Sequence, residues 1–141
     1  MNDAWGRRFF IAGSVLLLLI GVVHSTSFFE TPKPANDTEK QLLTLMSAYH
    51  FNLAGSSRSM NDLLRGFSMS FMLAALCFGG LDLVVRRERT RLLKHVTLVN
   101  ALWLAAMIVV SLRYFFIVPT SFLAVTLLAF ILAWIKLPAQ A

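Results

Sequence analysis

The sequence predicts an all-α integral membrane protein: a four-helix bundle with an additional short interfacial helix between the first and second spans. The 141 residues are 57% hydrophobic and only 14% charged, whereas soluble domains usually carry about 25% charged residues. The apolar residues form long unbroken blocks, which is typical of lipid-facing segments. A single transmembrane domain over residues 1–141 is therefore expected.

The net charge of +6 fits a membrane protein better than a nucleic-acid-binding protein. Five basic residues stand together between two apolar blocks: Arg86, Arg87, Arg89, Arg91 and Lys94. Cytoplasmic loops of membrane proteins carry such charge because they face anionic headgroups and resist translocation. No nucleic-acid-binding module accompanies the basic residues, so no nucleic-acid partner is expected. The single cysteine, Cys77, excludes an intramolecular disulfide and a thiol metal centre.

The first span is predicted at residues 9–29. The basic Arg7-Arg8 pair, the apolar run and Val23-His24-Ser25 together resemble a cleavable signal peptide, and the segment after Arg7 resembles a twin-arginine export signal. Three more apolar blocks follow, so we expect an uncleaved transmembrane helix.

The remaining spans are predicted at residues 60–85, 96–115 and 119–137, separated by an outer region at 30–58 and a basic cytoplasmic loop at 86–95. Ser59 and Asp62 have the spacing of a capping box at the start of the second span. Pro119 divides the third span from the fourth, because proline fits the first turn of a new helix. The pair Ala75 and Gly79 predicts close packing of the second span against a neighbour.

Within the outer region, residues 42–53 carry an apolar stripe at helical spacing: Leu42, Leu45, Met46, Tyr49 and Leu53. The segment is too short to cross a bilayer. We expect a short helix that lies at the interface or folds over the end of the bundle to bury this stripe.

The distribution of basic residues predicts that both termini are cytoplasmic, in a bacterial inner (plasma) membrane. The side that holds the termini would carry Arg7, Arg8, Lys136 and the basic loop. The opposite side would carry fewer basic residues, spread over a longer region, and acidic residues accompany them.

This topology gathers polar residues at the outer end of the bundle, and six of them form the candidate ligand pocket: His24, His50, Arg58, Asp62, Arg65 and Arg113. Polar groups within hydrocarbon must find partners, which makes them candidates for function. Two interpretations remain open, a ligand pocket and a structural network of helix caps and interhelical contacts. At the inner end, Asp82 is expected to pair with Arg86, one turn further along the helix.

Three functional hypotheses follow. The first is a protein that binds a lipophilic ligand or a membrane partner through the outer pocket, where arginines suit a carboxylate, phosphate or quinone-like headgroup. The second is a membrane enzyme or a haem or quinone redox subunit that uses His24 and His50. The third is an accessory subunit, or a homo-oligomer, that docks through its apolar fourth span. No sequence motif identifies a catalytic residue, a metal site or a cofactor.

The segment Gly55-Ser56-Ser57-Arg58-Ser59-Met60-Asn61-Asp62-Leu63, which leads into Gly66-Phe67-Ser68, resembles a signature of small, uncharacterised four-helix bacterial membrane proteins. The resemblance also includes the chain length and a histidine near the end of the first span. It implies the four-span topology and draws attention to Arg58, Asp62 and Ser68. It implies no reaction.

Overall fold

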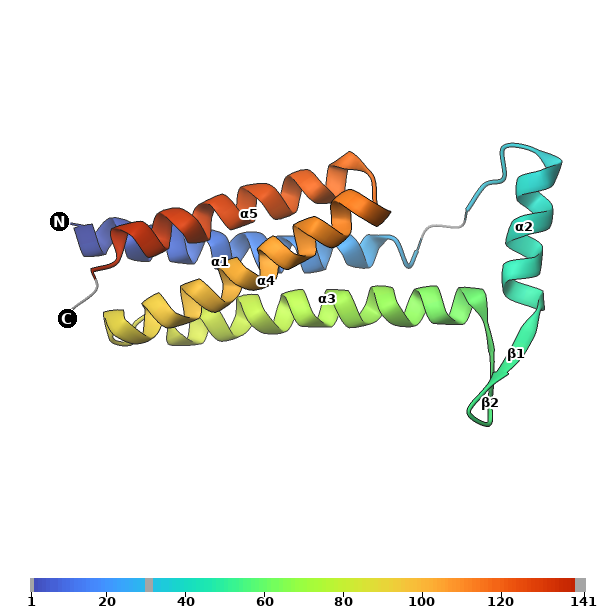
Figure 1. Ribbon diagram of the computed structural model, residues 1–141, viewed down its shortest axis with the longest axis horizontal. Helices are drawn as coiled ribbons and strands as arrows, with labels where there is room; N and C mark the ends of the chain where they lie inside the picture. The colour runs from blue at the N-terminus through green and yellow to red at the C-terminus, as the bar shows by residue number, and fades with distance from the viewer. Residues whose placement is uncertain (1, 30–31, 139–141) are drawn as a thin grey trace.

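The computed structural model describes residues 2–29 and 32–138. In chain order the elements are α1 (Asn2–Thr26), α2 (Asp37–Ala48), β1 (His50–Leu53), β2 (Ser56–Ser59), α3 (Met60–Val85), α4 (Thr90–Tyr114) and α5 (Ile117–Lys136). Helices α1, α3, α4 and α5 run alongside one another (Figure 1). Helix α1 begins and α5 ends at the same end of this bundle, and α2 lies across the opposite end together with the two strands.

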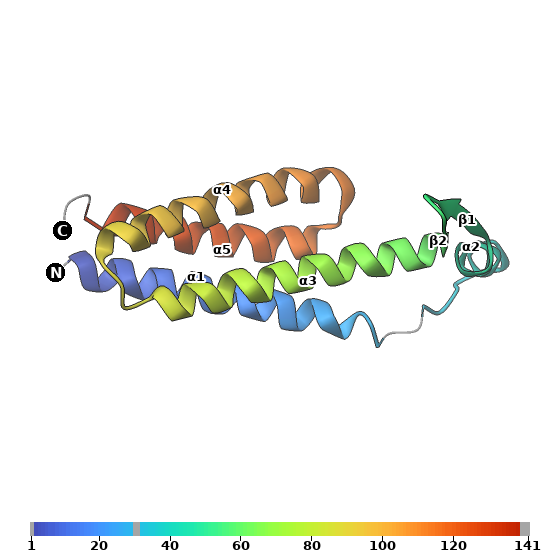
Figure 2. The ribbon, with the colours of Figure 1, turned by 90° about the horizontal axis from the view of Figure 1, so that it is seen from below.

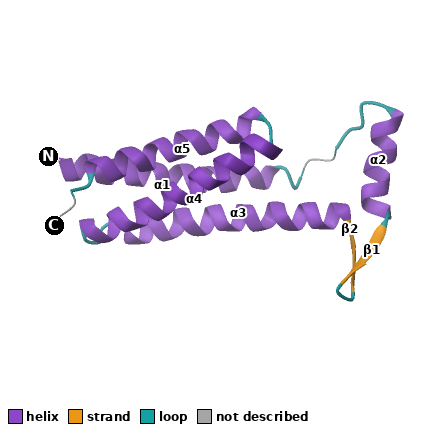
Figure 3. Cartoon of the chain, viewed as in Figure 1, coloured by secondary structure: helices purple, strands orange, loops and turns teal. Residues whose placement is uncertain are grey.

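The four long helices are each long and apolar enough to cross a membrane, with mean hydropathies from 1.8 to 2.2 over their most apolar stretches. The protein is thus dominated by α-helix, as the sequence predicts. Figure 3 shows that the described residues also form a two-stranded hairpin, β1–β2, between α2 and α3.

Helix α1 is at the centre of the bundle. It packs extensively against α3 and α5, and α4 packs mainly against α5, whereas α3 and α4 touch at few points. In Figure 2, α4 lies uppermost next to α5, and α1 and α3 cross each other below them. The buried core includes Phe10 and Leu17 of α1 and Phe130 of α5, and the rings of Phe10 and Phe130 meet edge to face at 6.0 Å. Such an aromatic contact adds to the gain from burying the two side chains.

The contact between α1 and α3 depends on a glycine. A Cβ atom at Gly79 would lie 2.8 Å from the carbonyl oxygen of Ser14 and 2.8 Å from Cγ of Leu18. The backbones can approach this closely only because residue 79 has no side chain. Ala75, one turn earlier, is also fully buried. The small residues predicted to allow close packing are therefore confirmed in that role.

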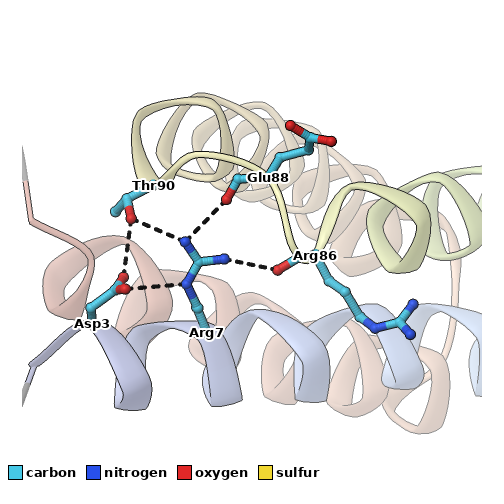
Figure 4. Close-up of polar contacts among 5 residues, drawn as sticks. All are labelled: Asp3, Arg7, Arg86, Glu88 and Thr90. Atoms are coloured by element: carbon cyan, nitrogen blue, oxygen red, sulfur yellow. Dashed lines mark hydrogen bonds and ion pairs between the residues drawn. The ribbon is translucent and has the colours of Figure 1, made fainter. Parts of the chain in front are cut away.

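Two helices begin earlier than expected at the end of the bundle that holds the start of α1, since α1 begins at Asn2 and α4 begins at Thr90. The loop between α3 and α4 is thus shorter than the predicted 86–95. Arg7 explains both differences (Figure 4). Its guanidinium forms an ion pair with Asp3 one turn earlier, at 3.2 Å, and donates to the carbonyl oxygens of Arg86 and Glu88, at 3.0 Å each. Carbonyl groups at the end of α3 lack helical partners, and a side chain of α1 supplies partners there.

The expected helix over residues 42–53 is wrong in its second half. Helix α2 ends at Ala48, and His50–Leu53 pairs with Ser56–Ser59 as an antiparallel hairpin. Ala54 (φ 48°) and Gly55 (φ 84°) form its two-residue turn, and positive φ at both positions is typical of type I′ hairpin turns. A helix that continued through Gly55 would lose this turn. The turn residues therefore determine the structure of residues 50–59, although the apolar stripe favours a helix.

The beginning of α2 also lies earlier than expected. Asn36 is its N-cap and accepts a hydrogen bond from the backbone N–H of Glu39 at 2.9 Å, while the Glu39 carboxylate accepts from the N–H of Ala35. The spacing of Asn36 and Glu39 is a helix-start signal in the sequence. Helix α2 has no buried residue, and Leu42 and Leu45 remain 56% and 62% exposed. The expectation that the bundle end buries the stripe is therefore wrong.

We predict opposite effects for two neighbouring glycine substitutions. Gly79→Ala should lower the free energy of unfolding by roughly 1–3 kcal/mol, because a helix backbone must move to admit the methyl group. Gly80→Ala meets no atom within 4 Å and should raise stability by roughly 0.5–1 kcal/mol through helix propensity. Reversible unfolding in detergent, followed by circular dichroism, measures both. Equal effects at the two positions would contradict the close approach of α1 and α3.

Candidate functional site

Three of the six candidate residues lie together at the start of α3. In the hairpin, His50 stands opposite Ser59 and Arg58 stands opposite Phe51. The Asp62 carboxylate accepts a hydrogen bond from the N–H of Ser59 at 2.9 Å, and the Ser59 hydroxyl accepts from the N–H of Asp62 at 3.2 Å. This reciprocal pair is the predicted capping box, which is confirmed. Asp62 therefore has a structural role, whatever else it does.

His24 lies near the end of α1 and is half-buried. Its ring meets the edges of Phe71 at 5.1 Å and of Phe28 at 6.2 Å between ring centroids. Its Nε2 atom is buried and makes no hydrogen bond within the described residues. The hydroxyls that follow it are occupied, because those of Ser25, Thr26 and Ser27 each donate to a carbonyl one turn earlier in α1.

Arg113 is exposed on the last turn of α4. In both views of the chain, α3 continues beyond the turn between α4 and α5 toward α2 and the hairpin. The structure thus groups His50, Arg58 and Asp62 and places His24 and Arg113 on other elements. A haem or quinone site that uses both His24 and His50 stays a prediction, since no hydrogen bond or ring contact of the described residues joins the two histidines.

A cavity of about 260 Å³ lies where the end of α1, α2 and the start of α3 meet. Its lining residues are Ser27, Phe28, Pro32, Leu43, Met46, Ser47, Asn61, Leu64, Arg65 and Ser68. Of the six candidate residues, Arg65 is the one that lines it. The cavity wall combines apolar side chains with hydroxyl, amide and guanidinium groups that donate hydrogen bonds, and no carboxylate occurs among its described lining residues.

A second polar cluster lies inside the bundle, near the opposite end. The Asp82 carboxylate is 2% exposed and accepts hydrogen bonds from the side-chain amide of Asn100 at 2.9 and 2.8 Å. The hydroxyl of Ser14 lies 3.3 Å from the same carboxylate. We name these three residues the Asp82 cluster. The expected ion pair between Asp82 and Arg86 is wrong, since the Arg86 guanidinium donates instead to the carbonyl oxygen of Leu83.

Sequence reasoning missed Ser14 and Asn100 as partners of Asp82. Each is an isolated polar residue in an apolar helix, and each lies on a different helix from Asp82. A signal was present, because Ser14, Asp82 and Asn100 lie five, three and four residues from the same end of the predicted spans 9–29, 60–85 and 96–115. Intramembrane polar residues at equal depth are candidates for mutual contact. Among residues 2–29 and 32–138, no group of three or more histidine, cysteine or acidic side chains could hold a metal ion.

We predict that Ser59→Ala lowers the free energy of unfolding by roughly 0.5–2 kcal/mol, the usual cost of losing an N-cap. Ser59 is 3% exposed, so the loss would leave the Asp62 backbone N–H without its partner. Ser57→Ala, on the exposed part of the same strand, is the matched control and should change stability little. Unfolding of both variants under identical detergent conditions measures the difference. Equal stability of the two variants would mean that the cap does not contribute.

Comparison of the chain with known protein families, with curated proteins and with solved structures finds no match. The resemblance carried by residues 55–71 therefore stays a prediction, and the function has to be argued from the chain's own residues.

Proposed function

We propose that this chain is a multi-pass protein of the bacterial inner membrane that binds a lipophilic ligand with an anionic headgroup in its outer-end cavity. The observation that carries the proposal is the cavity between α1, α2 and α3, where apolar side chains form part of the wall and Arg65 is the charged residue among the described lining residues. Membrane insertion, orientation and ligand class are supported by separate observations.

Insertion in a membrane is supported by the outward faces of the long helices. Large apolar side chains are exposed on each of them, such as Leu19 (50%), Leu73 (60%), Val109 (69%) and Leu128 (55%). Contiguous apolar surface on this scale is unfavourable in water and marks an interaction with lipid or protein. Lipid tails cover such side chains at no cost in hydrogen bonds.

Orientation with cytoplasmic termini is supported by arginines that remain exposed at the end where α1 begins: Arg8, Arg86, Arg87, Arg89 and Arg91. Arg7 and Lys94 of the same region are half-buried and donate to backbone carbonyl oxygens of other segments. Trp5 and Trp134 are 51% and 43% exposed on the first turns of α1 and the last turns of α5. Tryptophan is enriched at membrane interfaces and basic residues on the cytoplasmic side.

The ligand class follows from the donors and the shape of the cavity. Arg65, Asn61 and Ser68 offer hydrogen-bond donors on one face of α3, and Phe28, Leu43 and Met46 offer apolar surface opposite. A carboxylate or phosphate headgroup accepts from guanidinium in a charge-assisted bond. Cavities for drug-sized ligands are about 300–1,000 Å³, so a cavity of about 260 Å³ suits a headgroup and the first part of an acyl chain.

We predict that a cysteine placed at Glu88 is labelled by an impermeant maleimide only after the inner membrane is permeabilised. A cysteine placed at Ser57 in the hairpin should be labelled in cells whose outer membrane alone is permeable. Both positions are exposed, and both variants carry Cys77→Ala. Labelling of position 88 from outside an intact inner membrane would reverse the orientation.

We predict that Arg65→Gln weakens binding of a fluorescent long-chain fatty acid to the protein in uncharged detergent by roughly 10- to 100-fold, the usual effect of losing a hydrogen bond to a charged group. Arg113→Gln removes an equal charge outside the cavity lining and should leave the affinity unchanged. A fatty alcohol of the same chain length should bind wild type and Arg65→Gln alike. Equal affinity of both proteins for the acid would reject the headgroup assignment.

A further inference from the structure

The Asp82 cluster joins three helices in the interior of the bundle. Ser14 of α1 is fully buried, and Asp82 of α3 and Asn100 of α4 are each 2% exposed. Helices α3 and α4 otherwise touch at few points, so the hydrogen bonds between Asp82 and Asn100 are their main polar connection within the bundle. The cluster is remote from the outer-end cavity and shares no residue with it.

The hydrogen-bond donors available to Asp82 are too few for a buried carboxylate. One nitrogen of Asn100 lies 2.9 Å from Oδ1 and 2.8 Å from Oδ2, so it offers one N–H between the two oxygens. The Ser14 hydroxyl has a single hydrogen and a closer acceptor, the carbonyl oxygen of Phe10 at 2.8 Å, compared with 3.3 Å to Oδ2. An ionised carboxylate accepts only and has about four lone-pair sites. The cluster satisfies a minority of them.

No basic side chain of the described residues compensates the charge of Asp82. Arg86 on the same helix donates to the carbonyl oxygen of Leu83, and Figure 4 shows its side chain extending away from Arg7. The other charged or titratable groups near this end are either bonded elsewhere, as are Asp3, Arg7 and Lys94, or exposed, as are His95 of α4 and Lys136 of α5. The ion pair within the described residues is between Arg7 and Asp3. A buried carboxylate without a partner is strongly disfavoured.

We propose that the Asp82 cluster is a binding site for a small monovalent cation, either a proton or an alkali metal ion, that neutralises the carboxylate. A proton on Oδ2 would donate to the Ser14 oxygen, the Ser14 hydroxyl would donate to the carbonyl of Phe10, and Oδ1 would accept from Asn100. This arrangement gives the carboxyl proton, the Ser14 hydroxyl hydrogen and one Asn100 N–H an acceptor each, and it agrees with the two distances from the Ser14 hydroxyl. An alkali ion would instead take oxygens from Asp82, Ser14 and Asn100, since hard cations prefer oxygen ligands, and the Asn100 amide would turn to present its oxygen.

Infrared spectroscopy of the full-length protein in detergent at neutral pH separates the two cations. A proton at the site gives the carbonyl band of a protonated carboxyl group, which should be absent from Asp82→Asn and retained in Glu88→Gln. The Glu88 side chain is exposed and near the same end of the bundle, so it is the matched control. If Asp82→Asn does not fold, wild-type protein with ¹³C-labelled aspartate carboxyl groups gives the same assignment through the isotope shift of the band.

Stability against pH and salt provides the second readout. If the folded state holds a proton that the unfolded state releases, the unfolding equilibrium constant should rise by up to about tenfold per pH unit from about pH 4, where an unfolded aspartate ionises, up to the pH at which the folded carboxyl ionises. Replacing choline by sodium or lithium at constant ionic strength should leave this dependence unchanged. For an alkali ion site, no protonated band appears, and sodium or lithium should stabilise the wild-type protein but not Asp82→Asn. The proposal would be overturned if Asp82 is ionised and the stability of the wild-type protein responds neither to pH nor to alkali ions.

Discussion

The close approach of α1 and α3 at Gly79 is the constraint on which the rest of the bundle depends. The carbonyl of Ser14 lies in the space that a side chain at residue 79 would need, and the hydroxyl of the same serine reaches Asp82. A larger residue at position 79 would separate the helices and the polar contact together. Because α1 also packs against α5, a displacement of α1 would also disturb the packing between α1 and α5.

Sequence reasoning identified the long helices well because their signal is composition, which does not depend on partners. The second predicted span coincides with α3, whose start is fixed by the Ser59–Asp62 cap. Pro119 lies in the first turn of α5, as expected. The predicted helix boundaries were wrong where contacts with residues distant in the sequence determine them. The early start of α4 at Thr90 accompanies two hydrogen bonds of the Thr90 hydroxyl, which accepts from Arg7 of α1 and donates to the carboxylate of Asp3. No local pattern in the sequence reveals them.

The candidate site was less predictable than the fold. Placing six polar residues at one end of the bundle required only the topology, but their grouping depends on where residues 32–59 run. Those residues form a helix and a hairpin that extend beyond the bundle, so His50 and Arg58 lie on the hairpin, while Arg65 alone of the six lines the cavity. An ion pair between Asp82 and Arg86 was predicted because residues one turn apart are neighbours on a helix. Its actual partners are on other helices.

The central position of α1 has a consequence for biosynthesis. The ribosome makes α1 before the other three long helices, yet Phe10 packs against Phe130 of α5, and a Cβ atom at Gly13 would meet the same Phe130 ring. One side of α1 can pack on α3 as soon as α3 has been synthesised, but the other side must wait for α5. A nascent or truncated chain without α5 would therefore leave the tightly packing face of α1 uncovered. Quality control that recognises this face would distinguish chains that have α5 from chains that lack it.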